Sequence, residues 1–342
     1  DQHTNTATVD ASYSDDGGHT YTETQTDDAN YFGANPSYTI EKQVSVDGGV
    51  TWMDADAATG PELLIGNDPQ FRVIATNTGN VDVTVDVSDS DFASLSVTGF
   101  NLAVGDTNLV LVSATEPWAE DQHTNTATVD ASYSDDGGHT YTETQQDDAN
   151  YFGANPSYSV EKQVSVDGGL TWVDADSVTG PELLTGNDPQ FRVIATNTGN
   201  VDVTVDVSDP ALTGLDVTDV NLAVNDTNVV ISGPITGTWA EGQHTNTATV
   251  AGDYTDDGGH TFNDSQDDKA HYFGANPSYS IEKQVSVDGG ATWVDADSVT
   301  GPELLTGNDP QFRVIATNTG NVDVTVCLLY TSPSPRDCTD YL

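Results

Sequence analysis

The sequence has few basic residues, no long hydrophobic run and almost no cysteine. Its 342 residues include 8 Lys and Arg against 55 Asp and Glu, which gives a formal net charge of −47. Nucleic-acid binding needs a basic surface, so this balance excludes a nucleic acid as a partner. It also excludes electrostatic docking on an anionic membrane. No stretch approaches the roughly 18 apolar residues of a transmembrane helix, so we expect no membrane span in this chain.

The two cysteines, Cys327 and Cys338, both lie close to the C-terminus. The run that begins at Cys327, CLLYTSPSPRD, resembles the in-frame translation of a transposon adapter used in sequencing libraries, and the composition changes abruptly after Val326. We therefore interpret residues 327–342 as a non-native tail. Without this tail the chain has no cysteine, and no disulfide or thiol chemistry is expected. We also expect the gene to be cut off at Val326, rather than the protein to end there.

A repeat of about 120 residues organises the chain, which is the size of a domain and not of a solenoid unit. Pro36 recurs as Pro156 and Pro277, each inside the segment GANPSY. The segment DQHTNTATVD that begins at Asp1 recurs at Asp121. The sequence therefore predicts two complete repeats at 37–156 and 157–277. They are flanked by the C-terminal part of a preceding repeat at 1–36, the truncated N-terminal part of a further repeat at 278–326, and the tail at 327–342.

The local pattern indicates β-strands throughout. Residues 81–88 alternate valine with polar residues, which is the period of a strand with one buried face, and no segment shows a sustained helical period. About seven short strands per repeat, separated by Gly-rich turns, are typical of an immunoglobulin-like sandwich. The expected fold is therefore all-β, with tandem immunoglobulin-like β-sandwich domains. The expected strands of the first full repeat are 37–46, 50–55, 70–77, 81–88, 107–114, 123–134 and 139–151, with 89–105 ambiguous.

The aromatic residue on the second expected strand, Trp52, admits two interpretations. A single aromatic on a strand belongs to the core more often than to the surface, so we expect Trp52 in the core. The alternative is a surface contact for a ligand.

Three motifs recur in a fixed order in both complete repeats: IEKQVSVDGG or its close variant from Ile40, NTGN from Asn77 followed by alternating valine, and TNTATV from Thr124. Together they resemble the conserved Ig-like tandem repeat of large bacterial and archaeal surface proteins of the adhesin type. The resemblance implies β-sandwich modules in a secreted or cell-surface protein with a stalk or adhesion role, each contacting its neighbouring repeats. It implies no catalytic residues. The chain departs from the plainest members in its heavy Asp loading and its long Asp-Asp-Gly-Gly hairpin.

Aspartates recur in the turns, and Ca²⁺ prefers several carboxylate and carbonyl oxygens. If seven strands alternate in direction, Asp54, Asp56, Asp89 and Asp135 meet at the end of the sandwich that receives the preceding repeat. This parity predicts a Ca²⁺ site that stiffens each joint between repeats. The candidate ligands are Asp27, Asp28, Asp54, Asp56, Asp68, Asp89, Asp135, Asp136, Asp147, Asp148, Asp174, Asp176, Asp188, Asp209, Asp256 and Asp257.

Three other interpretations stay open. The acidity can serve solubility alone, since none of the loops has EF-hand spacing. The stretch 90–117, which differs from its counterpart 210–238, can be a face for a surface glycan or a protein, or simply a tolerant loop. Paired carboxylates also suit glycoside hydrolysis, but no catalytic motif is present and an active site repeated in every copy is unusual, so we expect no enzyme.

The favoured hypothesis is a structural or adhesive stalk module of an extracellular or cell-surface protein. The second hypothesis is a carbohydrate- or protein-binding repeat module, and the third is a glycoside-processing enzyme.

Overall fold

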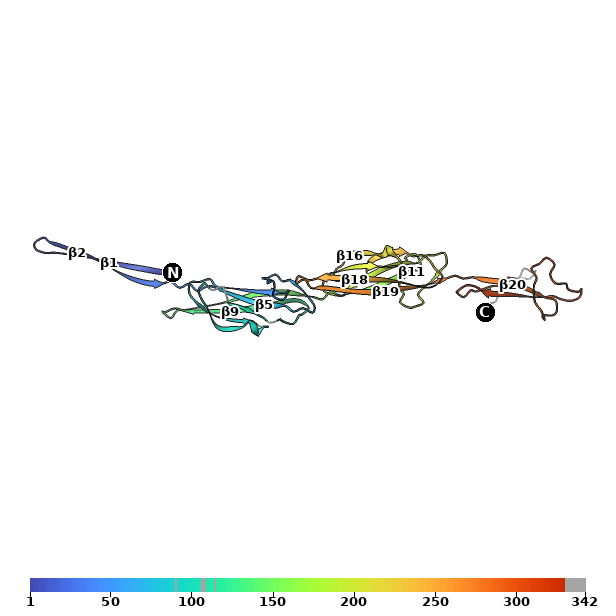
Figure 1. The fold of residues 1–342 in the computed structure, drawn as a ribbon, viewed down its shortest axis with the longest axis horizontal. Helices are drawn as coiled ribbons and strands as arrows, with labels where there is room; N and C mark the ends of the chain where they lie inside the picture. Colours follow the sequence, from blue (N-terminus) through green and yellow to red (C-terminus); the bar gives the residue numbers. More distant parts are fainter. Residues whose placement is uncertain (90, 106–108, 114, 330–342) are drawn as a thin grey trace. The chain divides into compact units, whose positions relative to one another are not determined.

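The structure of the protein is a computed structural model that describes residues 1–89, 91–105, 109–113 and 115–329. Residues 330–342, most of the expected non-native tail, lie outside the described part. The fold is all-β: the described helical segments are two short 3-10 turns, η1 (Ala93–Leu95) and η2 (Thr213–Leu215). Among the described residues there is no helix with the length and hydrophobicity needed to cross a membrane. Figure 1 follows the strands from the N-terminal hairpin to the C-terminal sheet.

The chain divides into two compact units, and unit 1 consists of Asp1–Ser157, Gly199–Val201 and Asp253–Phe262. It begins with an antiparallel hairpin of β1 (Gln2–Ser14) and β2 (Thr20–Phe32), whose residues are exposed along both strands. Two further sheets form a β-sandwich. The first has the order β3 (Tyr38–Ser45), β5 (Gln70–Asn77), β8 (Leu109–Val112), and the second β4 (Glu62–Leu64), β10 (Thr140–Ala154), β9 (Asp121–Ser134), β6 (Val83–Asp89), β7 (Val97–Leu102).

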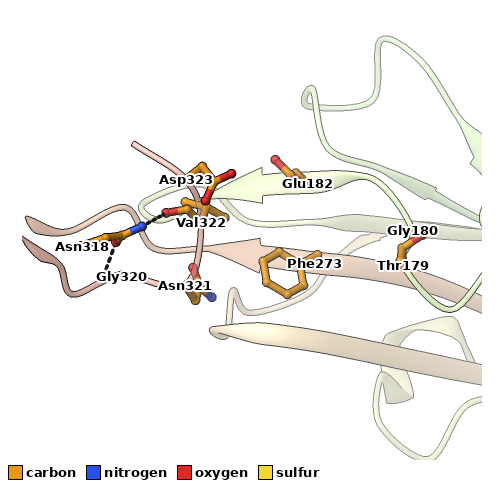
Figure 2. A pocket seen from close by; sticks show the side chains of 9 residues that line it. All are labelled: Thr179, Gly180, Glu182, Phe273, Asn318, Gly320, Asn321, Val322 and Asp323. Atoms are coloured by element: carbon orange, nitrogen blue, oxygen red, sulfur yellow. Dashed lines mark hydrogen bonds between the residues drawn. The ribbon is translucent and has the colours of Figure 1, made fainter. Parts of the chain in front are cut away.

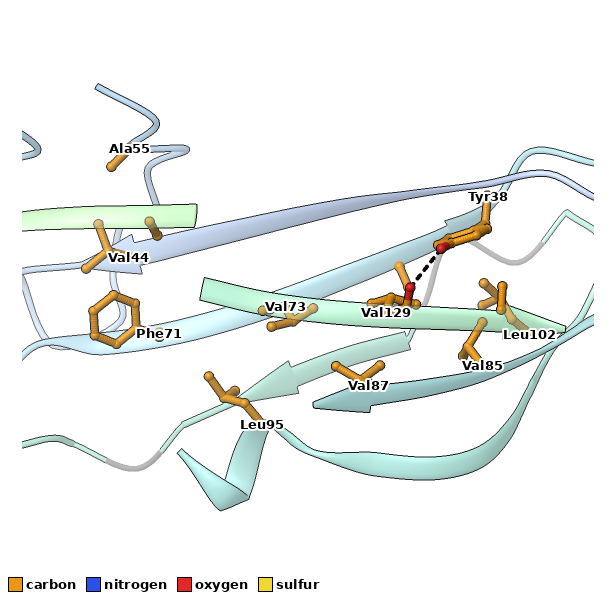
Figure 3. Packing of buried hydrophobic residues seen from close by; sticks show 14 of the residues in the cluster. Tyr38, Val44, Ala55, Phe71, Val73, Val85, Val87, Leu95, Leu102 and Val129 are labelled. Atoms are coloured by element: carbon orange, nitrogen blue, oxygen red, sulfur yellow. Dashed lines mark hydrogen bonds between the residues drawn. The ribbon is translucent and has the colours of Figure 1, made fainter. Parts of the chain in front are cut away.

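The core of unit 1 lies between these two sheets (Figure 3). Phe71 and Val73 of β5 are buried against Val85 of β6 and Val129 of β9, because alternate residues of each strand face inward. Leu95 of η1 closes one side of the cluster with no exposed surface. Each buried valine or leucine contributes roughly 1.5–3 kcal/mol, so this core is the main source of stability.

Unit 2 repeats the sandwich and consists of Tyr158–Thr198, Asp202–Gly252 and Asn263–Leu342. One sheet has the order β12 (Val173–Asp174), β11 (Tyr158–Ser165), β14 (Gln190–Asn197), β17 (Val229–Thr236). The other has the order β13 (Glu182–Leu184), β19 (Thr261–Ala275), β18 (Gly242–Thr255), β15 (Val203–Ser208), β16 (Val217–Leu222). A further sheet contains β21 (Val294–Asp295), β20 (Tyr279–Ser286) and β22 (Gln311–Asn318), and its side chains are mostly exposed.

Most of the expected strands of the first repeat are present, and the expected strand 70–77 is confirmed as β5. The ambiguous stretch 89–105 contains η1 and the edge strand β7. The expected strand 50–55 is wrong: the structure has only a single bridge between Val44 and Met53 there. A tight turn precedes it, in which the Asp47 carboxylate accepts hydrogen bonds from the Thr51 N–H at 2.9 Å and from its hydroxyl at 2.5 Å. The same turn in the second repeat is followed by the two-residue strand β12.

Trp52 does not belong to the core, so that expectation is also wrong. Its ring is only half-buried and lies against the Arg72 guanidinium, with 4.6 Å from the guanidinium carbon to the ring centroid. The Trp52 indole N–H donates to the Gly49 carbonyl at 3.1 Å. Stacking on a cation holds the ring at the sheet surface.

Candidate functional site

The first and last strands of the repeat in unit 1, β3 and β10, lie side by side and run in the same direction. The Tyr38 hydroxyl donates to the Val129 carbonyl of β9 at 2.8 Å and also lies 3.1 Å from the Glu143 carbonyl of β10. The Gln145 side-chain amide donates to the Tyr38 carbonyl at 3.2 Å. Further along both strands, the Lys42 N–H donates to the Asp147 carboxylate at 2.5 Å. We call this line of contacts between β3 and β10 the seam.

The same seam exists in unit 2 between β11 and β19. The Tyr158 hydroxyl donates to the Asp264 carbonyl at 3.1 Å, and the Gln266 amide donates to the Tyr158 carbonyl at 2.9 Å. The Lys162 N–H donates to the Asp268 carboxylate. The seam is therefore common to the two repeats, which carry nearly the same residues at these positions.

An acidic cluster lies on the seam of unit 1. Asp54 and Asp56, both exposed, place carboxylate oxygens within 4.8 Å of each other and of the half-buried Asp147. Burial raises the pKa of Asp147, and the negative charges of Asp56 and Asp54 add to this shift. Burial also raises the pKa of Asp54, as does the neighbouring Asp56. The cluster therefore carries a repulsive energy that a bound cation would relieve.

Unit 2 contains the equivalent cluster of Asp174, Asp176 and Asp268, with the same spacing limit of 4.8 Å. Burial raises the pKa of both Asp174 and Asp268. Asp268 is the one cluster member absent from the predicted ligands. The signal that identifies it is the repeat itself, because Asp268 stands in the second repeat where Asp147 stands in the first.

Three carboxylates in this arrangement suit a hard divalent cation. Ca²⁺ takes six to eight oxygen ligands, each carboxylate can supply one or two, and water can complete the shell on the exposed side. The donor set contains no nitrogen or sulfur, which disfavours zinc and copper. The cluster lies within one repeat, on the seam, and not at the joint between repeats where the strand parity predicted the site.

The predicted convergence of acids at one end of the sandwich is wrong for Asp89 and Asp135. Because 50–55 does not cross the sheet, β5 starts opposite the end of β3, with Gln70 paired to Ser45. This reverses the expected direction of β5 and β6. Asp89 is therefore paired with Ala127, whereas the Asp135 turn follows Ser134 at the far end of β9, roughly 25 Å away along the strand.

Asp89 has a different partner from the one predicted. Its carboxylate oxygen Oδ2 lies 2.5 Å from the Lys42 Nζ, and both side chains have no exposed surface. Asp209 and Lys162 repeat the pair at 2.7 Å, again with both side chains fully buried. Burial lowers the pKa of Lys42, and the hydrogen bond and charge of Asp89 oppose that shift. Burial raises the pKa of Asp89, but the hydrogen bonds from Lys42 and Asn125 outweigh it and hold that pKa below its usual value.

The remaining predicted ligands are dispersed and mostly have structural contacts. Asp68 and Asp188 accept the N–H groups of Trp118 and Trp239 at 3.2 and 2.9 Å. Asp135 accepts the His139 N–H at 2.8 Å inside its own turn. The others are exposed residues of strands or turns: Asp27, Asp28, Asp136 and Asp148.

Asp256 and Asp257 form the acidic tip of the β18–β19 hairpin, and this tip is part of unit 1. Asp256 accepts the Leu64 N–H at 2.6 Å and Asp257 accepts the Glu62 N–H at 2.8 Å. The Tyr254 hydroxyl donates to the Glu62 carboxylate at 2.6 Å. The two aspartates thus satisfy the outward N–H groups of the short edge strand β4, which protects that edge from other strands.

A pocket of about 680 Å³ in unit 2 lies between β13, β19 and the turn that follows β22 (Figure 2). Glu182, Phe273 and Asn321 line it from these three elements. Its lining includes the carboxylates of Glu182 and Asp323 and, within the described residues, no histidine, cysteine or serine.

The chain was also compared with known proteins. No protein family matches it, and no curated protein is similar to it.

Proposed function

We propose that the chain is a load-bearing stalk module of an extracellular or cell-surface protein, built from tandem immunoglobulin-like sandwiches. The observation that carries this proposal is the seam. When the two ends of a repeat are pulled apart, parallel first and last strands must slide past each other, so all hydrogen bonds of the seam are loaded at once. Antiparallel end strands would instead open one bond at a time.

Calcium is part of the same proposal. The acidic cluster includes Asp147, whose carboxylate accepts the Lys42 N–H on the seam. A Ca²⁺ ion held by Asp54, Asp56 and Asp147 would join the segment after β3 to β10 and remove the repulsion between the three carboxylates. The cation would then resist sliding of β10 along the seam.

Single-molecule pulling on the full chain, held by its two ends, tests the proposal. We expect two separate force peaks, one from the sandwich in each unit, that rise in calcium and fall in chelator. Smooth extension without force peaks would contradict a load-bearing role.

A binding repeat is the second candidate function, and one observation favours it. A pocket of about 340 Å³ in unit 1 is lined in part by Phe92, Glu116 and Pro117, which lie in the stretch where the two repeats differ. Side chains that vary around a pocket suit recognition of different partners. A glycan array probed with the chain and with the variant Phe92→Ala tests this candidate, because specific binding must be lost in the variant.

A further inference from the structure

Each sandwich encloses a group of three buried polar side chains that the stalk function does not explain. In unit 1 the group consists of Lys42, Asp89 and Asn125, and the Asp89 carboxylate contacts both of the others. Its Oδ2 lies 2.5 Å from the Lys42 Nζ, and its Oδ1 accepts a hydrogen bond from the Asn125 side-chain amide at 3.0 Å. In unit 2 the corresponding distances from Asp209 to Lys162 and Asn246 are 2.7 and 3.1 Å. An amine, a carboxylate and a carboxamide therefore meet in each core.

The carboxamide is the unusual member of this group. Among the described residues, the Oδ1 atoms of Asn125 and Asn246 are the buried side-chain atoms that lack a hydrogen-bond partner. Asn125 is only 4% exposed and Asn246 only 8%. An unsatisfied buried polar atom is costly and rare, and it occurs here at the same position in both repeats. The loss of stability from these two unsatisfied oxygen atoms indicates that the asparagines have a role other than packing.

The amine is held in surroundings that favour its neutral, nucleophilic form. Lys42 has no exposed surface, and its Nζ lies 5.5 Å from the centroid of the Phe71 ring. Burial lowers the pKa of Lys42. In an apolar core, transfer of the ammonium proton to the touching carboxylate removes two buried charges at once. Lys162 lies in the same position, 5.6 Å from the Phe191 ring centroid.

We propose that these groups react to form an intramolecular isopeptide bond in each repeat, between Lys42 and Asn125 and between Lys162 and Asn246. Lys42 lies on β3 of one sheet and Asn125 on β9 of the other, so the bond would join the two sheets covalently. This modification site is argued from the buried groups alone and does not rest on the proposed stalk function.

The reaction balances without any oxidant, reductant or co-reactant. Asp89 first accepts a proton from the Lys42 ammonium. The amine lone pair then attacks Cγ of Asn125 and forms the Nζ–Cγ bond. The Cγ–Nδ2 bond breaks with its electron pair on nitrogen, which takes the proton from Asp89 and leaves as ammonia. Asp89 receives the second Nζ proton and ends as a neutral acid, so the buried ion pair disappears.

Asp89 is suited to this transfer because it touches both reacting side chains, and in its protonated form it can donate to the partnerless amide oxygen. Ammonia also has a path outward. The pocket of about 340 Å³ described above is lined by Asn125 itself, together with Asp91 and Tyr151.

The chain supplies its own negative controls. Lys283 stands in the same EKQVS motif on β20 but is exposed, and Asn5 stands in the same TNTATV motif on β1 and is also exposed. Neither residue meets a buried carboxylate in the described structure. These two residues should therefore remain unmodified while the buried pairs react.

Mass spectrometry of the full chain, reduced and fully denatured, tests the proposal. The expected mass is lower than the sequence mass by two ammonia molecules. Lys42→Ala, Asn125→Ala and Asp89→Ala should each restore one ammonia, and Lys283→Ala should restore none. Asn125→Asp should convert one loss of ammonia into one loss of water. Proteolysis should yield a branched peptide that contains both Lys42 and Asn125.

The wild-type mass decides the matter even if a variant fails to fold. An unmodified mass would overturn the proposal. A loss of water from the wild-type chain would overturn the assignment to Asn125, because it would place the bond on Asp89.

Discussion

The ammonium nitrogen of Lys42 lies 2.5 Å from a carboxylate oxygen of Asp89, and neither side chain reaches solvent. Desolvation makes such a pair expensive to bury, and removal of one partner leaves an uncompensated charge in the core. The pair is therefore a sensitive point of the first sandwich, and Lys162 with Asp209 is the same point of the second.

The first prediction concerns this pair. Asp89→Ala should destabilise the first sandwich by about 3–5 kcal/mol, because the variant cannot form the isopeptide bond and leaves the Lys42 charge buried without its partner. Hydrogen exchange measured on peptides from β3 and β9 reports this change, and peptides from β11 and β18 serve as the internal control. Lys283→Ala, at the exposed equivalent position, should change exchange hardly at all. Unchanged exchange in β3 of the Asp89 variant would contradict the account.

The second prediction concerns pH. The pKa values of Asp54 and Asp147 are raised in the folded chain, chiefly by burial and further by the neighbouring carboxylates. The folded state then binds protons more tightly than the unfolded state, so this cluster costs stability as the pH rises through the raised pKa values. Asp54→Asn should therefore stabilise the chain more at pH 7 than at pH 4. Thermal melts of both proteins at the two pH values measure the difference, and an equal effect at both would contradict the assignment.

The third prediction concerns calcium. A cation that binds only the folded state raises its stability by about 2.7 kcal/mol at a hundred times its Kd. Calcium should therefore raise the Tm of the chain in chelator-treated buffer. The fourfold variant Asp54→Asn, Asp56→Asn, Asp174→Asn, Asp176→Asn should lose this response. Asp27→Asn with Asp28→Asn, which changes exposed strand residues, should keep it. If the wild-type Tm is the same with and without calcium, the calcium part of the proposal is wrong.

The fourth prediction concerns the hairpin tip in unit 1. Asp256→Ala with Asp257→Ala removes the acceptors of the buried Leu64 N–H and of the exposed Glu62 N–H. The buried N–H left unsatisfied costs about 1–3 kcal/mol. Hydrogen exchange of the peptide that contains β4 should accelerate. The matched variant Asp135→Ala with Asp136→Ala changes the same tip motif without these partners and should leave β4 unaffected. Equal exchange of β4 in both variants would show that the tip contributes nothing there.

The sequence was sufficient to predict the all-β fold and most strands, because alternating apolar residues such as Phe71 and Val73 state directly which face is buried. It was insufficient for β4, whose three residues pair in parallel with the distant end of β10. Such a pairing leaves no local pattern. The expected strand 50–55, which is only a single bridge in the structure, inverted the expected direction of β5 and β6 and misplaced the predicted calcium site.

The candidate site shows the same limit. Three carboxylates on the seam are brought together by Asp147, which is separated from Asp54 and Asp56 by most of the repeat. The burial of Lys42 was not predicted from the sequence, because lysine is rarely buried unless it has a partner and the sequence does not show which residue that partner is. The alternation along the strand nevertheless predicts that Lys42 faces inward. Lys42 lies two residues from Ile40 and two from Val44, on the inward face of β3.

The central claim is that the seam between the first and last strands carries load, and pulling on a chain with one altered seam tests it most directly. The double variant Tyr38→Phe, Gln145→Ala removes seam hydrogen bonds of the first sandwich, together with the bond from Tyr38 to the Val129 carbonyl. The second sandwich is unaltered and remains as the reference within the same molecule. We predict that one force peak drops while the other keeps its wild-type value. Two unchanged peaks would contradict the claim.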